Sequence, residues 1–190
     1  MADRKLLITG ATGKQGGAVI DALISRSAPF QILALTRNAS SVKAKSLASK
    51  PSVTVVEGDY ASAARIFSNH GPIYGVFLVT TMGKAGEEEA QATPIITEAA
   101  KAGVEHVIFT SVDRGGAGKS EVNPTNVPHF ASKHRIETLL KEKAAEAKMK
   151  WTILRPVGFM DNYTPGFIGR AAATLWASLG DTPLAGDFGS

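Results

Sequence analysis

The chain has 190 residues, of which 44% are hydrophobic, which is enough for one sizeable core and too few for two ordinary domains. It has no cysteine, so disulfide bonds and thiolate metal ligands are excluded, and an intracellular location, cytoplasmic or nuclear, is favoured. The net charge is +4, but lysines and arginines are scattered among acidic residues, which argues against direct nucleic-acid binding. No apolar run near the N-terminus reaches the length of a signal peptide or membrane span, so we expect no membrane partner.

Short apolar segments alternate with stretches long enough to hold a helix. The predicted strands are Lys5–Thr9, Gln31–Thr36, Val53–Glu57, Val76–Thr80, His106–Ser111 and Trp151–Arg155. The predicted helices are Gln15–Ser27, Ser41–Ser49, Ala61–Asn69, Gly86–Ala102 and Phe130–Met149. Most of the strands are continuously apolar, as in parallel strands covered by helices on both faces. The sequence therefore predicts an α/β fold with a doubly wound, mostly parallel sheet, the NAD(P)-binding Rossmann fold.

Two stretches qualify this alternation. Residues Arg114–Val127 are rich in Gly, Pro and Asn and have no apolar period, which predicts a loop above the carboxyl ends of the strands. The stretch Lys133–Lys150 mixes lysines with acids, and the four-residue spacing of Glu137 and Lys141 predicts a solvated helix face.

The pattern changes near the end of the sequence. We expect a Rossmann domain over residues 1–157 and the start of a truncated C-terminal region over 158–190, with a helix near Gly166–Leu179. The substrate-side region is thus expected to be largely absent.

The strongest motif follows the first predicted strand and reads Gly10-Ala11-Thr12-Gly13-Lys14-Gln15-Gly16. Gly10 suits a tight exit from the strand, Gly13 a close approach of backbone to a pyrophosphate, and Gly16 close packing of the helix on the sheet. The helix N-terminus then offers free N–H groups to phosphates. The plainer alternative is that the glycines serve turn geometry alone, but their place between strand and helix favours a dinucleotide site.

Residues at the ends of later strands extend this prediction. Arg37 follows the second strand, where NAD-binding domains usually carry an acid, so NADP is the favoured cofactor; an exposed arginine at a strand end is the alternative. Asp59 can accept a hydrogen bond from the adenine amine or cap the next helix. Thr80 and Thr81 stand at the end of the fourth strand, where they can border the ribose and phosphates or cap a turn.

The runs GATGKQGG, LTR, VEGDY, PHFASKHRIE and WTILRPVGFMDN together resemble the NmrA-like group of atypical short-chain dehydrogenases/reductases. The resemblance implies NADP binding and a second, smaller domain that closes over the cleft. A lysine that some relatives use has no match in Glu89–Thr93. By position, the implied dinucleotide contacts are Gly10 to Gln15, Arg37, Asp59, Tyr60, Val79, Thr80, Thr81, Lys133, Pro156, Val157, Gly158 and Phe159.

Active short-chain dehydrogenases carry a Tyr-x-x-x-Lys pair on the helix after the fifth strand, and here His129 takes the place of the tyrosine. His129 and Lys133 share a helix face, so an imidazole can stand in as proton donor, while Ser111 can orient a carbonyl. The plainer interpretation, which we favour, is that Lys133 only holds the ribose and His129 lines the wall.

Three classes of function compete. The first is a redox sensor or regulator that binds NADP(H) and reports it to a protein partner. The second is an NAD(P)H-dependent reductase of a quinone or small carbonyl compound, which the missing tyrosine disfavours. The third, a DNA-binding regulator, is disfavoured by the diffuse charge. We rank them in this order, and whether the chain is an enzyme stays open.

Overall fold

The computed structural model describes residues 4–159 together with Arg170 and Thr174. The polypeptide divides into two compact units, Met1–Arg155 and Pro156–Ser190. This division falls two residues before the predicted domain boundary, which remains a prediction. The predicted helix near Gly166–Leu179 lies, apart from Arg170 and Thr174, outside the described residues.

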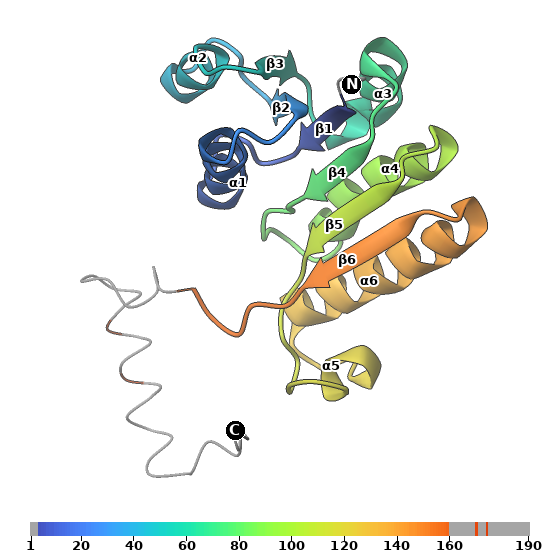
Figure 1. Ribbon diagram of the computed structural model, residues 1–190. Helices are drawn as coiled ribbons and strands as arrows, with labels where there is room; N and C mark the ends of the chain where they lie inside the picture. Colours follow the sequence, from blue (N-terminus) through green and yellow to red (C-terminus); the bar gives the residue numbers. More distant parts are fainter. Residues whose placement is uncertain (1–3, 160–169, 171–173, 175–190) are drawn as a thin grey trace. The chain divides into compact units, whose positions relative to one another are not determined.

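All six predicted strands form, and each begins and ends within two residues of its predicted bounds. They are β1 (Arg4–Ile8), β2 (Phe30–Thr36), β3 (Val53–Glu57), β4 (Gly75–Leu78), β5 (His106–Thr110) and β6 (Lys150–Leu154). Every neighbouring pair is parallel, and the strand order is β3-β2-β1-β4-β5-β6 (Figure 1). The chain order reverses between β1 and β4, which is where ligands bind in sheets of this kind.

Helices follow the strands as expected, with bounds set by local chemistry. They are α1 (Lys14–Ser25), α2 (Val42–Ala48), the short 3₁₀ turn η1 (Tyr60–Ser62), α3 (Ala63–His70), α4 (Glu87–Lys101), α5 (Lys119–Val122) and α6 (Pro128–Ala147). The Ser41 hydroxyl accepts a hydrogen bond from the Ala44 amide and so caps α2. Helix α6 begins at Pro128, two residues earlier than predicted, because the fixed φ of proline suits the first helical position.

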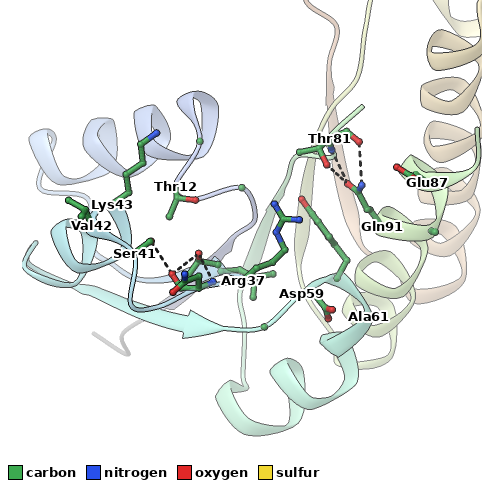
Figure 2. A pocket seen from close by; sticks show the side chains of 18 residues that line it. Thr12, Arg37, Ser41, Val42, Lys43, Asp59, Ala61, Thr81, Glu87 and Gln91 are labelled. Atoms are coloured by element: carbon green, nitrogen blue, oxygen red, sulfur yellow. Dashed lines mark hydrogen bonds between the residues drawn. The ribbon is translucent and has the colours of Figure 1, made fainter. Parts of the chain in front are cut away.

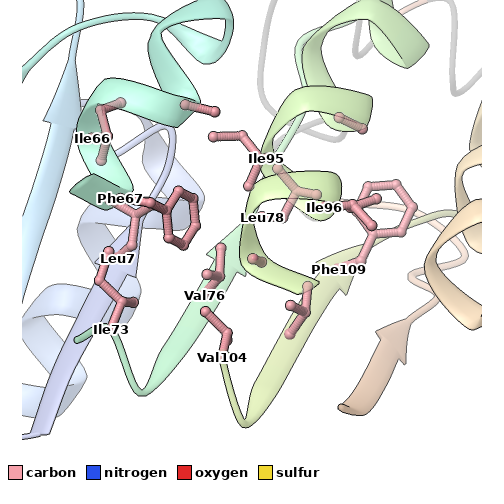
Figure 3. Packing of buried hydrophobic residues seen from close by; sticks show 14 of the residues in the cluster. Leu7, Ile66, Phe67, Ile73, Val76, Leu78, Ile95, Ile96, Val104 and Phe109 are labelled. Atoms are coloured by element: carbon pink, nitrogen blue, oxygen red, sulfur yellow. The ribbon is translucent and has the colours of Figure 1, made fainter. Parts of the chain in front are cut away.

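Two apolar layers cover the two faces of the sheet. On one face, α3, α4 and α6 pack side chains such as Phe67, Ile95 and Leu140 against Leu78 and Phe109 of the strands (Figure 3). On the other face, α1 and α2 contribute Ile20 and Leu47 to a smaller layer with Ile8, Ile32, Ala34 and Phe77. The doubly wound α/β fold predicted from the sequence is therefore confirmed.

The predicted loop Arg114–Val127 was expected to hold no regular structure, and this expectation is wrong. It contains α5, and its anchor is Arg114, which is 4% exposed. The Arg114 amide donates to the Ser120 hydroxyl at 2.7 Å, and its guanidinium donates to the backbone carbonyls of Ser120 and Asn123. These bonds link a buried side chain to the turns around it, and a search for apolar periodicity does not detect such links.

The predicted solvated face of α6 is also wrong at Glu137, which is 1% exposed. Its carboxylate lies 2.8 Å from Arg114 Nη2 and 2.7 Å from Arg155 Nη2, and it accepts a hydrogen bond from the Ser111 hydroxyl. Burial raises the pKa of Glu137, but the hydrogen bonds from Arg114, Arg155 and Ser111 outweigh that effect and lower it to about 2. We call these four residues the Glu137 cluster; it ties the β5–α6 loop and the end of β6 to α6.

Candidate functional site

A cleft of about 850 Å³ lies at the carboxyl ends of β1, β2 and β3 and extends to the N-terminal part of α4 (Figure 2). Seven of the predicted cofactor residues line it: Gly10, Thr12, Gly13, Arg37, Asp59, Tyr60 and Thr81. The lining residues that the sequence did not single out include Ser41, Val42, Lys43, Glu87, Ala90 and Gln91. The cleft therefore brings together the glycine turn and the ends of β2, β3 and β4.

The glycine turn has the tight geometry that its sequence predicts. Gly10 has φ +59°, a conformation that favours glycine, and its carbonyl accepts from the Gly13 amide at 2.9 Å. Gly13 is the N-cap of α1, so the helix N-terminus opens beside the cleft. A Cβ on Gly16 would lie 2.4 Å from the Gly10 carbonyl oxygen, so only glycine lets α1 pack against the strand exit.

Other residues of the predicted motif serve the fold or face solvent. Ala11 is buried in the layer beneath α1 and α2. Lys14 is exposed and Gln15 is half-buried, and neither is among the residues that line the cleft. Within the motif, Gly10, Thr12 and Gly13 line the cleft, Ala11 and Gly16 serve packing, and Lys14 lies at the surface.

Beyond β2 the cleft is lined by positive charge. Arg37 is exposed and lies between Ser41 on one side and Asp59 on the other (Figure 2). Lys43, on the first turn of α2, also lines the cleft. The sequence analysis missed Lys43. Its position could have indicated a role, because Lys43 stands two residues after Ser41, which caps α2 and follows Arg37 in the sequence.

At the end of β3, Asp59 and Tyr60 both have protein partners. Asp59 accepts from the amide and hydroxyl of Ser62 at 2.9 and 2.7 Å, and these bonds lower the pKa of Asp59. The capping role considered for Asp59 is therefore present, although Asp59 caps the 3₁₀ turn η1 that precedes α3. The Tyr60 hydroxyl donates to the Val79 carbonyl at 2.7 Å, and burial raises the pKa of Tyr60.

The segment after β4 is fixed by a side chain that sequence reasoning missed. Gln91 Oε1 accepts from the Thr81 amide at 2.8 Å and from its hydroxyl at 3.2 Å, while Gln91 Nε2 donates to the Thr81 carbonyl at 3.3 Å (Figure 2). Gln91 lies in the stretch where the expected lysine has no match. It binds the protein backbone and holds Thr81 at the cleft wall.

Lys133, which we expect to hold the ribose, lies beside the ends of β4 and β5, and its ammonium group is fully engaged by the protein. It lies 3.0 Å from Glu88 Oε1 and donates to the Thr80 hydroxyl at 2.5 Å and to the Thr110 carbonyl at 3.2 Å. These three acceptors match the three protons of an ammonium group. Burial lowers the pKa of Lys133, and the nearby Glu88 carboxylate opposes that effect.

The two other candidates for proton chemistry do not join this arrangement. His129 lies exposed in the first turn of α6, stacks edge-on against Phe130, and has no hydrogen bond or ion pair within the described part of the chain. Ser111 is 6% exposed and its hydroxyl donates to Glu137, so this proton is not available to orient a substrate carbonyl. No hydrogen bond or ion pair among the described residues therefore links His129, Lys133 and Ser111, and a catalytic role for them remains a prediction.

The last predicted contacts, Pro156, Val157, Gly158 and Phe159, belong to the second unit, and their role toward a cofactor remains a prediction. Among the described residues, no helix is both long enough and apolar enough to cross a membrane. The same residues contain no group of three or more His, Cys, Asp or Glu side chains placed to hold a metal ion.

A parallel sheet with this strand order, a glycine turn between β1 and α1, and a cleft at the carboxyl ends of the strands define the first unit as a Rossmann-type domain. The chain belongs to the NmrA-like family, which it matches over residues 2–171.

Known relatives cover both regulators and reductases. Quinone oxidoreductase 2 of Escherichia coli is 30% identical over 83% of this chain and 50% of its own length. The nitrogen metabolite repression protein of Neurospora crassa is 27% identical over 79% of this chain and 35% of its own length. The crystal structure of the NADPH-dependent quinone oxidoreductase of E. coli in complex with NADPH superposes with a TM-score of 0.66 at 27% identity, over 91% of this chain and 54% of that one. The chain thus spans about half or less of the length of these relatives.

Proposed function

We propose that this chain binds NADP(H) in the cleft, with the pyrophosphate at the N-terminus of α1. The observation that carries this proposal is the cleft itself, with the Gly10–Gly13 turn on one wall and Arg37 and Lys43 beyond the end of β2. A Cβ on Gly13 would lie 3.1 Å from the Gly10 carbonyl oxygen, so the tight turn that lines the cleft favours glycine at this position. Backbone amides and a helix N-terminus are the groups that bind a pyrophosphate.

The choice of NADP(H) over NAD(H) rests on charge at the end of β2. Arg37 occupies the place where an acid would bind a ribose 2′-hydroxyl, and a guanidinium can form a bidentate contact with a 2′-phosphate instead. Lys43 adds a second cation on the same side of the cleft. Asp59, the acid that lines the cleft after β3, is already bonded to Ser62.

We propose further that the protein acts as a redox sensor or regulator that reports bound NADP(H) to a protein partner, with little or no turnover. A bound nicotinamide supplies hydride transfer, but reduction of a carbonyl compound also needs a placed proton donor. Among the described residues, His129 is exposed and unbonded, Ser111 donates to Glu137, and Lys133 has three protein acceptors. Binding alone needs none of these groups to move a proton.

A second candidate is an NADPH-dependent quinone reductase. The observation in its favour is the 30% identity to a quinone oxidoreductase over most of this chain. A quinone can accept hydride and then take its proton from water, so this reaction tolerates the lack of a protein acid. Reduction of a small carbonyl compound, in contrast, needs a placed proton donor.

Two measurements test these proposals. The first is titration calorimetry with NADPH and NADH, and the second is NADPH oxidation, followed at 340 nm, with quinones, aldehydes and ketones as substrates. We expect NADPH to bind, turnover to be negligible with all three classes, and His129→Ala to match the parent chain in binding. Turnover with quinones alone, unchanged by His129→Ala, would favour the reductase. Turnover that collapses in His129→Ala would contradict the sensor and make the imidazole a working acid.

A further inference from the structure

Glu88, in the first turn of α4, is 4% exposed although it stands between two other glutamates in the sequence. Its Oε1 accepts from the Thr80 hydroxyl at 2.9 Å and lies 3.0 Å from the Lys133 ammonium. Thr80 follows β4 and Lys133 lies on α6, so this carboxylate joins three elements at the carboxyl edge of the sheet. The sequence analysis did not single out Glu88.

The surroundings make Glu88 the charge that stabilises the Lys133 ammonium. The Lys133 side chain is 12% exposed, and its ammonium lies 5.1 Å from the centre of the Phe109 ring. The other nearby acids have their own cations: Glu89 pairs with Arg135, and Glu137 pairs with Arg114 and Arg155. A buried ammonium without a counterion tends to lose its proton.

Glu88 makes its contacts through one of its two carboxylate oxygens. Its second oxygen, Oε2, is buried and has no hydrogen-bond partner among the residues that the structure describes, and the same is true of Glu89 Oε2. The contacts that distinguish Glu88 are those of Oε1, which joins the Thr80 hydroxyl and the Lys133 ammonium.

We propose that Glu88 is a positioning residue of the dinucleotide site, which keeps the Lys133 ammonium charged and holds it over the ends of β4 and β5. This proposal rests on the proposed binding of NADP(H), in which the nicotinamide-side ribose reaches these strand ends. A ribose hydroxyl would replace a neutral acceptor, the Thr80 hydroxyl or the Thr110 carbonyl, because the charged Glu88 is the strongest of the three partners. Glu88 then acts through Lys133 and does not touch the cofactor.

The test compares Glu88→Gln with Glu89→Gln, a matched control on the same helix turn whose carboxylate pairs with Arg135. Two probes are titrated from pH 6 to pH 9.5: NADPH, and adenosine 2′,5′-bisphosphate, which lacks the nicotinamide half. We expect the affinity of Glu88→Gln for NADPH to fall about tenfold as pH rises, toward that of Lys133→Met, because the unpaired ammonium loses its proton. The bisphosphate, the parent chain and Glu89→Gln should not show this fall.

Each other outcome contradicts a specific statement. If the NADPH affinity of Glu88→Gln equals that of Glu89→Gln at every pH, the proposal is overturned. If the bisphosphate fails to bind the parent chain, the proposed function itself is overturned. Glu88→Asp keeps the charge and should resemble the parent; if it behaves like Glu88→Gln, charge is not the requirement and the proposal fails. If Glu88→Gln does not fold, Glu88→Asp is tested in its place. An NMR titration of ε-¹³C-labelled lysine then follows the protonation of Lys133, whose signal is assigned by its absence in Lys133→Met.

Discussion

Arg114 Nη2 and Glu137 Oε2 lie 2.8 Å apart, and the two side chains are 0% and 2% exposed. Replacing Glu137 with Gln should therefore leave the Arg114 guanidinium buried without its counterion. We expect a loss of about 3–5 kcal/mol in the free energy of unfolding, measured by urea denaturation. Glu142→Gln, an exposed position on the same helix, is the control and should change stability by less than about 0.5 kcal/mol. Equal stability of the two variants would show that Glu137 contributes nothing to the fold.

Protonation of the same carboxylate should lower the free energy of unfolding of the protein at acid pH. The pKa of Glu137 is lowered from its ordinary 4.5 to about 2 in the folded state, so between these values the unfolded chain binds more protons. Its contribution is full above pH 4.5 and is lost as pH falls toward 2, on the order of 3 kcal/mol in total. Urea midpoints measured from pH 5 to pH 2.5 should converge for the parent chain and Glu137→Gln. A constant difference over that range would contradict this prediction.

Two adjacent glycines of α1 should respond in opposite ways to a methyl group. A Cβ on Gly16 would lie 2.4 Å from the Gly10 carbonyl oxygen and 2.9 Å from the Ala11 Cα, which are backbone atoms that cannot rotate away. Gly16→Ala should destabilise the protein by about 1–3 kcal/mol. A Cβ on Gly17 would meet only the Ala11 carbonyl oxygen at 3.6 Å, so Gly17→Ala should gain about 0.5–1 kcal/mol of helix stability. Thermal unfolding of both variants measures the difference, and similar melting temperatures would refute the close approach at Gly16.

Arg37 should determine the preference for NADP(H) over NAD(H). A bidentate contact with a 2′-phosphate is worth about 1.5–3 kcal/mol, or roughly a tenfold to hundredfold preference, which Arg37→Ala should abolish. Lys43→Ala should reduce the preference by a smaller factor, since an ammonium makes a single point contact. Lys45→Ala, on the same helix but outside the residues that line the cleft, is the matched control. Discrimination that survives in Arg37→Ala would place 2′-phosphate recognition elsewhere.

The sequence was sufficient for those features that depend on neighbours along the chain. Apolar runs located the six strands, and the glycine spacing located the turn between β1 and α1, because both are set by local backbone geometry. The position of Lys133 on the helix after the fifth strand was predictable for the same reason, but its contacts with Thr80 and Thr110 were not.

What sequence reasoning missed depends on side chains that meet across the fold. Glu88 and Gln91 read as ordinary polar residues of an exposed helix turn, yet one holds Lys133 and the other holds Thr81. Glu137 read as part of a solvated face, because the i,i+4 rule says which residues are neighbours on a helix and not which side faces the core. Its two arginine partners lie on a loop and at the end of β6, and nothing in their local sequence indicates that they converge.

The central place of β1 in the sheet has a consequence for how the chain is made. Leu6 is paired with Ile32 of β2 on one side and with Gly75 of β4 on the other, so one edge of β1 lacks its partner in the sheet until β4 has left the ribosome. Until then β1 presents an unpaired apolar edge, which is the kind of surface that invites wrong pairing and recruits chaperones. The glycine turn and Arg37 belong to the half that is synthesised early, while Thr81 and Lys133 belong to the later half. We therefore expect the adenosine half of the site to be complete on nascent chains before its nicotinamide half exists.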